Sequence, residues 1–328
     1  MGKLDILTKE YMKRPDIFAD VFNQFLYHGR QIIVPERLVE LDTTEIAVPY
    51  GADHVSVPEQ RYRDVAKLLM AMTDGYAAYC ILAAENEGKI HYAAPVKNCL
   101  YDAIQLAHQV TAAAASHRKS KLADKKLSNK NLSNKKLSNK KLSGDEFLSG
   151  FWKEDRLLPV VTVVIYFGAE EWDGPLSLHE MYSDCSEEIR RYAMDYRVNL
   201  ITPGGLSDSE IDEFQSGMRE IMRYIKYSKD KKKLHSVIST ELRFKSVERE
   251  AVEIINAATG SNMKISEGKE SVDVCIAIQG MMEDSRIEGA ITFAQKLGAQ
   301  KEQVKKSIME EFDKDDKEAE ELIQAYWK

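Results

Sequence analysis

Two acidic residues, Asp64 and Glu85, lie at equal distances along the chain from the dipeptide Asp74-Gly75. Asp-Gly is typical of a two-residue β-hairpin turn, because both central residues of that turn adopt positive φ. The flanking runs are mostly apolar, so a hairpin closed on this turn would place Asp64 directly opposite Glu85. Like charges in that position destabilise a sheet unless a cation lies between them. A hard divalent cation bound by carboxylate oxygens would meet this need.

Further polar side chains follow Glu85 at the spacing of a strand. Side chains alternate between the two faces of a strand, so Glu87 and Lys89 are expected to share the face of Glu85. An Asp, a Glu and a third polar group on adjoining strands can hold Mg²⁺, position a water molecule and stabilise charge on a phosphodiester. The pattern therefore predicts a magnesium-dependent hydrolytic site.

Several elements would position these side chains, and the sequence indicates the first strand of the hairpin less clearly than the others. The apolar residues Val65, Leu68, Leu69 and Met72 fit helical spacing as well as a strand, so periodicity does not decide, and the turn signal and the family resemblance given below favour the strand. Pro95 to Ser116 is predicted to be a helix, with Lys97 outside its apolar stripe. The remaining predictions are a central buried strand at 157–167, a neighbouring strand at 197–202, and helices at 15–27 and 209–227.

A basic segment interrupts an otherwise acidic chain. The chain carries a formal charge of −7, yet residues 118–141 hold ten Lys or Arg and one acid, Asp124. Four near-identical pentamers, of the type Lys-Lys-Leu-Ser-Asn, fill 125–144. One Leu in five buries too little apolar surface to offset chain entropy, so we expect a flexible insertion at 118–150. It is either a tolerated repeat expansion or an electrostatic arm for DNA phosphates.

Beyond residue 228 the chain changes to Lys- and Glu-rich helical patterns. Helices are predicted at 245–258, 272–297, 301–312 and 314–327, with Gly298 and Asp313 at two of the breaks. We therefore divide the chain into a domain at 1–228 and a helical C-terminal region at 229–328. The apolar stripes of that region suit self-association as a homo-oligomer, a partner's groove or packing within the chain.

Composition and cysteine usage exclude several classes of protein. With 328 residues, 44% hydrophobic and 30% charged, the sequence is ordinary for a globular protein. It has neither an apolar run long enough to span a bilayer nor a signal-peptide core, so we expect a cytoplasmic protein without a membrane partner. The four cysteines are scattered, which argues against zinc and a disulfide framework and favours buried free thiols.

Four stretches of sequence carry a family resemblance. In chain order they are Arg61-Tyr62-Arg63-Asp64, Ile81-Leu82-Ala83-Ala84-Glu85-Asn86-Glu87, Pro95-Val96-Lys97-Asn98-Cys99-Leu100-Tyr101-Asp102 and Ile165-Tyr166-Phe167-Gly168-Ala169-Glu170-Glu171-Trp172. Together they resemble the recombination-promoting nuclease (transposase) family of the PD-(D/E)XK nuclease superfamily. The resemblance covers roughly residues 4–228, with the pentamers inserted, and extends to the helical C-terminus.

The resemblance implies an α/β fold with a restriction-endonuclease-like αβββαβ core. It also implies DNA as partner, Mg²⁺ or Mn²⁺ as cofactor, and a DNA endonuclease activity linked to recombination or mobile elements. By position, Asp64 and Glu85 become metal ligands. The third motif position, usually Lys in the superfamily and commonly Gln in this family, falls on Glu87.

Glu87 leaves the predicted site short of positive charge. We expect it to help bind the metal or orient water, while Lys89 or Lys97 supplies the charge that aids catalysis. Asp20, on the first predicted helix, is either a further metal ligand or a solvated helix charge. Tyr101 either touches substrate or lies at the helix surface. The alternative function is a catalytically inactive nuclease-fold protein that binds DNA or supports assembly.

Overall fold

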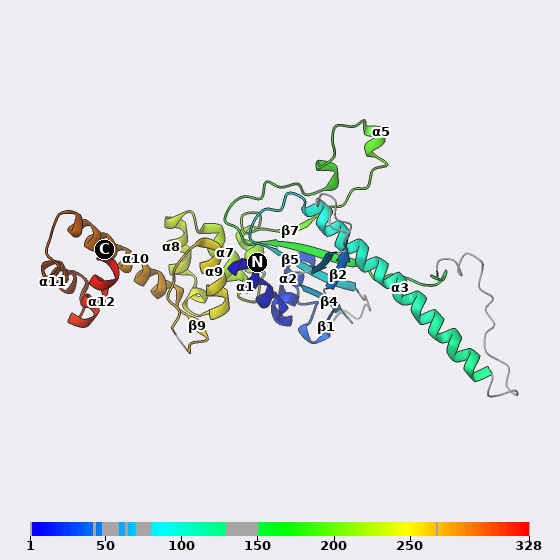
Figure 1. Cartoon of the computed structure of the whole chain (residues 1–328), viewed down its shortest axis with the longest axis horizontal. Helices are drawn as coiled ribbons and strands as arrows, with labels where there is room; N and C mark the ends of the chain where they lie inside the picture. The colour runs from blue at the N-terminus through cyan, green and yellow to red at the C-terminus, as the bar shows by residue number, and fades with distance from the viewer. Residues whose placement is uncertain are drawn as a thin grey trace. The chain divides into compact units, whose positions relative to one another are not determined.

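The computed structural model describes residues 2–41, 44–47, 59–62, 65–69, 80–128, 150–266 and 268–327 (Figure 1). Within them the chain divides into two compact units, 1–216 and 217–328. The sequence predicts this division after 228, because the composition changes there to Lys- and Glu-rich helical patterns. The protein is a mixed α/β protein, and each unit is described by itself below.

The first unit is built on a five-stranded mixed sheet with the strand order β1-β4-β5-β6-β7. β1 and β4 pair antiparallel, β4 and β5 pair antiparallel, and β5, β6 and β7 run parallel to one another. A separate two-stranded ribbon pairs β2 with β3. The bounds of the strands are β1 Leu38–Glu40, β2 Thr44–Ala47, β3 Glu59–Tyr62, β4 Val65–Leu69, β5 Cys80–Glu87, β6 Val160–Tyr166 and β7 Asn199–Ile201.

The pairing of β4 with β5 has the register that the sequence predicts. Val65 lies opposite Ala84, and Leu69 lies opposite Cys80. The strand prediction for this segment is therefore confirmed over the described residues, and the helical alternative is wrong. The Asp74-Gly75 turn and Asp64 lie outside the described residues. The predictions of a central strand at β6 and of its neighbour at β7 are also confirmed.

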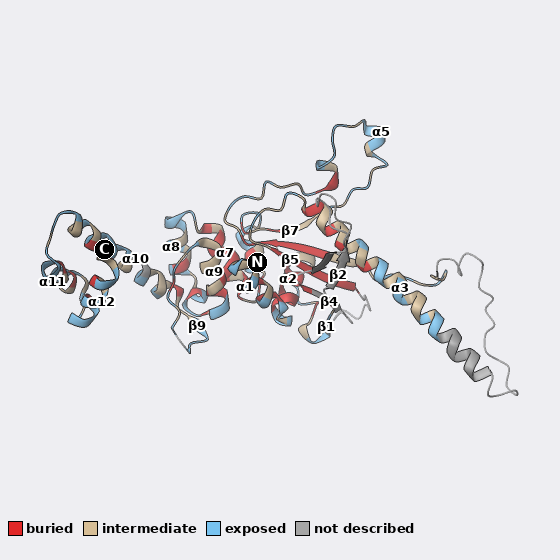
Figure 2. Cartoon of the chain, viewed as in Figure 1, coloured by how far each residue is buried: buried red, intermediate tan, exposed pale blue. Residues whose placement is uncertain are grey.

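Helices cover the two faces of this sheet (Figure 1). α1 (Lys3–Lys13) and α2 (Pro15–Tyr27) pack beside β4 and β5, with Met12, Phe18 and Phe22 fully buried. α2 has the predicted bounds, and its Pro15 occupies the first turn, where a missing N–H costs nothing. α3 (Ala94–Ser128) packs against β6. Figure 2 shows β5 and β6 as buried strands between these layers.

Helix α3 is longer than the sequence indicated. It continues to Ser128, so residues 118–128 are helical and not part of a flexible insertion. The physical reason is that extending an existing helix adds one hydrogen bond for each residue fixed, and Ala, Leu, Lys and Arg fit a helix interior well. The rest of the predicted insertion, at 129–149, lies outside the described residues.

After β6 the chain makes a long excursion before it returns to the sheet at β7. This excursion contains η2 (Leu178–Glu180) and the short helix α5 (Glu187–Arg190). After β7, α6 (Asp208–Asp212) begins with a capping box in which Ser207 and Glu210 each bind the other's backbone N–H. The predicted helix at 209–227 is divided, because α6 ends at Asp212 and α7 begins only at Met218.

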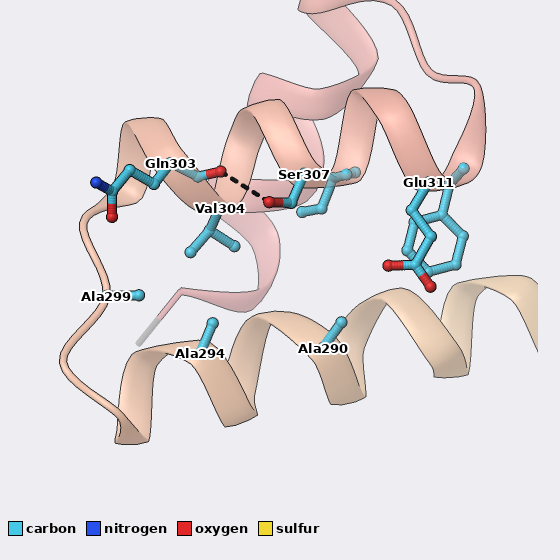
Figure 3. A pocket seen from close by; sticks show the side chains of 9 residues that line it. Ala290, Ala294, Ala299, Gln303, Val304, Ser307 and Glu311 are labelled. Atoms are coloured by element: carbon cyan, nitrogen blue, oxygen red, sulfur yellow. Dashed lines mark hydrogen bonds between the residues drawn. The ribbon is translucent and has the colours of Figure 1, made fainter.

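The second unit is helical, as the sequence predicts for most of its length. α10, α11 and α12 enclose a core of Ile287, Ile291, Val304, Ile308, Ala319 and Ile323. Ala290 and Ala294 of α10 face α11 across a cavity of about 270 Å³ (Figure 3). Both predicted breaks are confirmed, since Gly298 and Asp313 have φ of 75° and 50°. The bounds are α7 Met218–Tyr227, α8 Lys231–Thr240, η3 Leu242–Lys245, β8 Val247–Glu248, α9 Arg249–Thr259, β9 Ser271–Val272, α10 Val274–Lys296, α11 Lys301–Phe312 and α12 Asp316–Tyr326.

Two observations bear on the predictions from composition. All four cysteines are free thiols, although only Cys80 is fully buried. No helix in the described part of the chain is long and apolar enough to cross a membrane.

A buried lysine, Lys67, makes the stability of the first unit depend on pH. Lys67 of β4 is 3% exposed, and its Nζ donates to the carbonyl of Lys13 at 2.9 Å. Burial lowers the pKa of Lys67, and the charge of Glu40 only partly opposes the shift. The native state therefore releases this proton at a lower pH than the unfolded chain does, so the cost of burying the charge falls as pH rises.

We expect the stability of the wild type relative to Lys67→Met to rise between the lowered pKa and the ordinary lysine pKa of about 10.4, and then to level off. Urea unfolding of both proteins at a series of pH values from neutral to alkaline measures this difference. If the stability of the wild type relative to Lys67→Met stays constant or falls over this pH range, Lys67 does not have a lowered pKa in the native state.

Candidate active site

Three charged side chains converge where β5 ends and α3 begins. The Nζ atom of Lys97 lies 3.1 Å from Oε2 of Glu85 and 2.8 Å from Oε1 of Glu87. The two carboxylates come from one strand with one residue between them, so they share a face as predicted. Lys97 lies in the first turns of α3, which packs on that face. We call Glu85, Glu87 and Lys97 the ion triad.

The ion triad is largely removed from water. The side chains of Glu85, Glu87 and Lys97 are 2%, 16% and 18% exposed. Burial by itself lowers the pKa of Lys97, but the charges of Glu85 and Glu87 outweigh burial, and the pKa is raised above its ordinary value. Lys97 is therefore held as a cation between two carboxylates.

The fold fixes the triad from two directions. β6 runs parallel to β5, with Val164 opposite Glu85 and Tyr166 opposite Glu87, so Glu85 is held in the middle of the sheet. One turn after Lys97 in the helix, the buried ring of Tyr101 lies with its centroid 6.0 Å from the Lys97 ammonium. Tyr101 therefore packs inside the protein and not at the helix surface.

Two other predicted site residues have different positions. β5 ends at Glu87, so Lys89 lies in the bend that follows the strand, where it is exposed. Its predicted place on the strand face is wrong, because Gly88 ends the regular alternation. Asp64 lies outside the described residues. Of the two lysines that the sequence left open, Lys97 is the one that contacts the carboxylates.

Asp20 is neither a solvated charge nor placed with the ion triad. It is 4% exposed, and its carboxylate accepts hydrogen bonds from the backbone N–H of Gln215 and of Ser216 and from the Ser216 hydroxyl, at 2.6–3.1 Å. The role that these contacts define is a structural one, because the carboxylate ties α2 to the end of the first unit. The position of Asp20 on the predicted helix did not predict these partners, because they are far away in the sequence.

A second polar network, which the sequence did not reveal, lies farther along α3. The carboxylate of Asp102 accepts hydrogen bonds from the Thr162 hydroxyl at 2.6 Å and from the Tyr196 hydroxyl at 2.7 Å. Asn199 in turn donates to the carbonyl of Thr162 at 2.9 Å. These contacts fix α3, and with it Lys97, against β6 and β7.

The donor chemistry of the triad is compatible with a magnesium ion. Glu85 and Glu87 direct oxygen atoms at one cationic centre, and carboxylate oxygens are the ligands that Mg²⁺ prefers. Among the residues that the structure describes, no three His, Cys, Asp or Glu side chains form a cluster able to hold a metal ion. The described part of the chain thus supplies two of the three carboxylates that the sequence predicts.

The fold and the site together define a mixed α/β protein with a buried carboxylate and ammonium cluster at the end of a parallel strand. Comparison of the chain with models of known protein families, with curated proteins and with solved structures gives no match.

Proposed function

We propose that the chain is a divalent-metal-dependent DNA endonuclease that hydrolyses phosphodiester bonds and is linked to recombination or mobile elements. The observation that carries this proposal is the meeting of Glu85 and Glu87 of β5 with Lys97 of α3 in one buried cluster. The cluster lies toward the carboxyl end of a parallel strand, where α/β proteins commonly place their ligands.

The order of the elements supports the proposal. Without the β2–β3 ribbon, the first unit has the sequence α2, β1, β4, β5, α3, β6. Its three antiparallel strands are followed by a helix and then by a strand parallel to the third. With α1 also left aside, this order is compatible with the αβββαβ core that the resemblance to the PD-(D/E)XK superfamily implies.

The residues of the chain have separate roles in this proposal. Glu85 and Glu87 would hold Mg²⁺ together with Asp64. Asp64 lies outside the described residues, and its predicted pairing with Glu85 follows the same register as the described pairs of β4 and β5. The bound metal supplies Lewis-acid activation of the phosphodiester and of a water molecule. Lys97 supplies the positive charge that a Lys at position 87 would provide and that Glu87 cannot.

Plasmid nicking tests the proposal. With Mg²⁺ or Mn²⁺ the wild type is expected to nick or linearise plasmid DNA, and chelation of the metal abolishes the reaction. Asp64→Ala and Glu85→Ala are expected to reduce cleavage to background, because each removes a metal ligand. Asp16→Ala, which changes an exposed carboxylate on α2, serves as the matched control. Equal activity in the wild type and both ligand variants would refute the assignment.

One observation favours the second candidate, a noncatalytic DNA-binding or assembly protein that keeps the fold. Lys97 pairs with both carboxylates, so the triad is also a structural ion cluster that forms without a metal. This candidate predicts DNA binding that weakens with salt and that occurs without metal uptake or cleavage.

A further inference from the structure

A cavity of about 780 Å³ lies in the second unit, between α8 and α10. Residues three and four positions apart share one face of a helix, and both helices line the cavity with such a face. α8 contributes Lys231, Leu234 and Ile238, and α10 contributes Ile278, Met282 and Arg286. Ligand-binding cavities have volumes of about 300–1000 Å³, so this one is large enough for a small organic molecule. We call it the α8–α10 cavity.

The walls of the α8–α10 cavity are mainly apolar. Leu234 and Ile238 line it from α8, and Ile278 and Met282 line it from α10. Met282 is 55% exposed, so part of this surface is open to water. Covering apolar side chains with an apolar group removes that surface from water, which is favourable. The walls therefore suit the apolar body of a ligand.

The hydroxyl groups beside these walls bond to one another. Tyr224 of α7, which is 2% exposed, and Ser261 both line the cavity, and their hydroxyl oxygens are 3.1 Å apart. The Ser261 hydroxyl lies 2.8 Å from that of Thr259, which donates to the carbonyl of Ile255 at 2.7 Å. Burial raises the pKa of the Tyr224 phenol, so the phenol stays neutral near neutral pH. These hydroxyls thus have partners within the protein and add no charge to the cavity.

The charged side chains of the lining are positive. Lys231, Lys232 and Arg286 line the cavity and are exposed, and His235 adds charge only when it is protonated. The Arg286 guanidinium also packs over Phe312, 5.6 Å from the ring centroid. Among the described residues that line the cavity, none is Asp or Glu, although the whole chain has a formal charge of −7. An anion is therefore attracted to this lining and meets no carboxylate in it.

The acids nearest to this lining in the sequence have other partners. Asp230 caps α8, and its carboxylate accepts hydrogen bonds from backbone N–H groups of the first turn at 3.0 and 3.1 Å. On α10, Glu283 pairs with Lys314 at 2.8 Å, and Asp284 pairs with Lys264 at 2.7 Å. Ion pairs thus direct the two α10 carboxylates to lysines outside the lining, and capping directs the Asp230 carboxylate to the helix backbone.

We propose that the α8–α10 cavity binds a small organic anion with an apolar body. Its anionic group contacts Lys231 and Lys232, and its body covers Ile278 and Met282. Inorganic phosphate has no body to cover the walls, and a neutral hydrocarbon gives the lysines no counter-charge. Duplex DNA presents phosphates but no apolar group for the walls. The site belongs to the second unit, and it goes beyond the proposed nuclease function and does not depend on it.

Fluorescence titration of the full-length protein tests the site with two probes that share one ring system. Anilinonaphthalene sulfonate is an anion with an apolar body, and phenylnaphthylamine has the same rings without the sulfonate. Lys231→Met combined with Lys232→Met is expected to weaken binding of the anionic probe about tenfold and of the neutral probe less than about twofold, because each exposed ion pair contributes a few-fold to affinity. Met282→Gln keeps the length of the side chain but makes the wall polar, so it is expected to weaken both probes about threefold.

The matched control is Lys306→Met combined with Lys317→Met. It removes two exposed lysines of α11 and α12, so it changes the net charge by the same amount as the variant at the cavity. The control is expected to change the affinity for either probe by less than about twofold, because exposed charges far from a ligand are screened by salt. Circular dichroism and urea unfolding of each variant verify that it is folded.

The proposal fails if the two double-lysine variants weaken the anionic probe equally, because binding then follows net charge and not this cavity. It also fails if Met282→Gln binds both probes as the wild type does, or if the wild type binds neither probe. If the wild type is an oligomer in sedimentation velocity and Met282→Gln dissociates it, the cavity is an interface between copies and the proposal is overturned. None of these measurements involves cleavage, so their outcome is independent of the plasmid-nicking test.

Discussion

Replacing Lys97 by Met is expected to lower the free energy of unfolding of the first unit by about 3–5 kcal/mol, which corresponds to a fall in Tm of roughly 10 °C. The Lys97 ammonium is the cation between Glu87 and Glu85, whose side chain is 2% exposed. Without it, two carboxylates on one face of β5 remain close together in a region with little water. Removing one partner of a buried ion pair leaves a charge that neither solvent nor protein compensates.

Urea unfolding near neutral pH, followed by circular dichroism, measures the effect of Lys97→Met. Lys119→Met is the matched control, because it removes an exposed lysine from the same helix. The triple variant Glu85→Gln, Glu87→Gln and Lys97→Met removes all three charges and is expected to recover more than half of the lost stability. A triple variant as unstable as Lys97→Met would show that the loss comes from packing of the lysine stem and not from uncompensated charge.

The sequence predicts most of the sheet that holds the triad, because turn and strand patterns among neighbouring residues determine that sheet. The Asp-Gly turn signal predicts the pairing of β4 with β5, although the spacing of the apolar residues does not decide between strand and helix, and the described pairs from Val65 to Leu69 confirm the pairing. The β-branched run before Phe167 predicts β6 in the same way, and Pro15 marks the start of α2. These features depend on residues near one another in the chain.

The parts that the sequence does not predict depend on contacts between distant residues. Lys89 and Lys97 are equivalent candidates by type, and only the end of β5 at Glu87 and the packing of α3 select Lys97. The buried bonds of Asp20 to Ser216 join residues far apart in the sequence, so helical spacing cannot reveal them. The excursion between β6 and β7 has no periodicity, since turns and side-chain hydrogen bonds build it.

The same geometry makes a second prediction, about catalysis and the identity of residue 87. Under the nuclease proposal, Lys97→Met is expected to lower the rate of plasmid cleavage at least about hundredfold, as removal of one preorganised electrostatic donor does in other enzymes. Adding Glu87→Lys to Lys97→Met removes one proposed metal ligand, leaves Asp64 and Glu85 to hold the metal, and places a cation at the motif position itself. Because residues 85 and 87 share a face of β5, a lysine at 87 lies on the side of Glu85.

The double variant is therefore expected to recover about tenfold in rate and part of the stability lost in Lys97→Met. Single-turnover cleavage at saturating Mg²⁺, with unfolding measured on the same preparations, separates the two effects, and Lys119→Met again serves as the control. If the Lys97→Met protein is less stable but cleaves at the wild-type rate, Lys97 has only a structural role. In that case Lys89→Met is the next variant to assay, because Lys89 is the other lysine near the end of β5. Recovery in the double variant would instead show that the site requires a cation on this face of β5, whichever element supplies it.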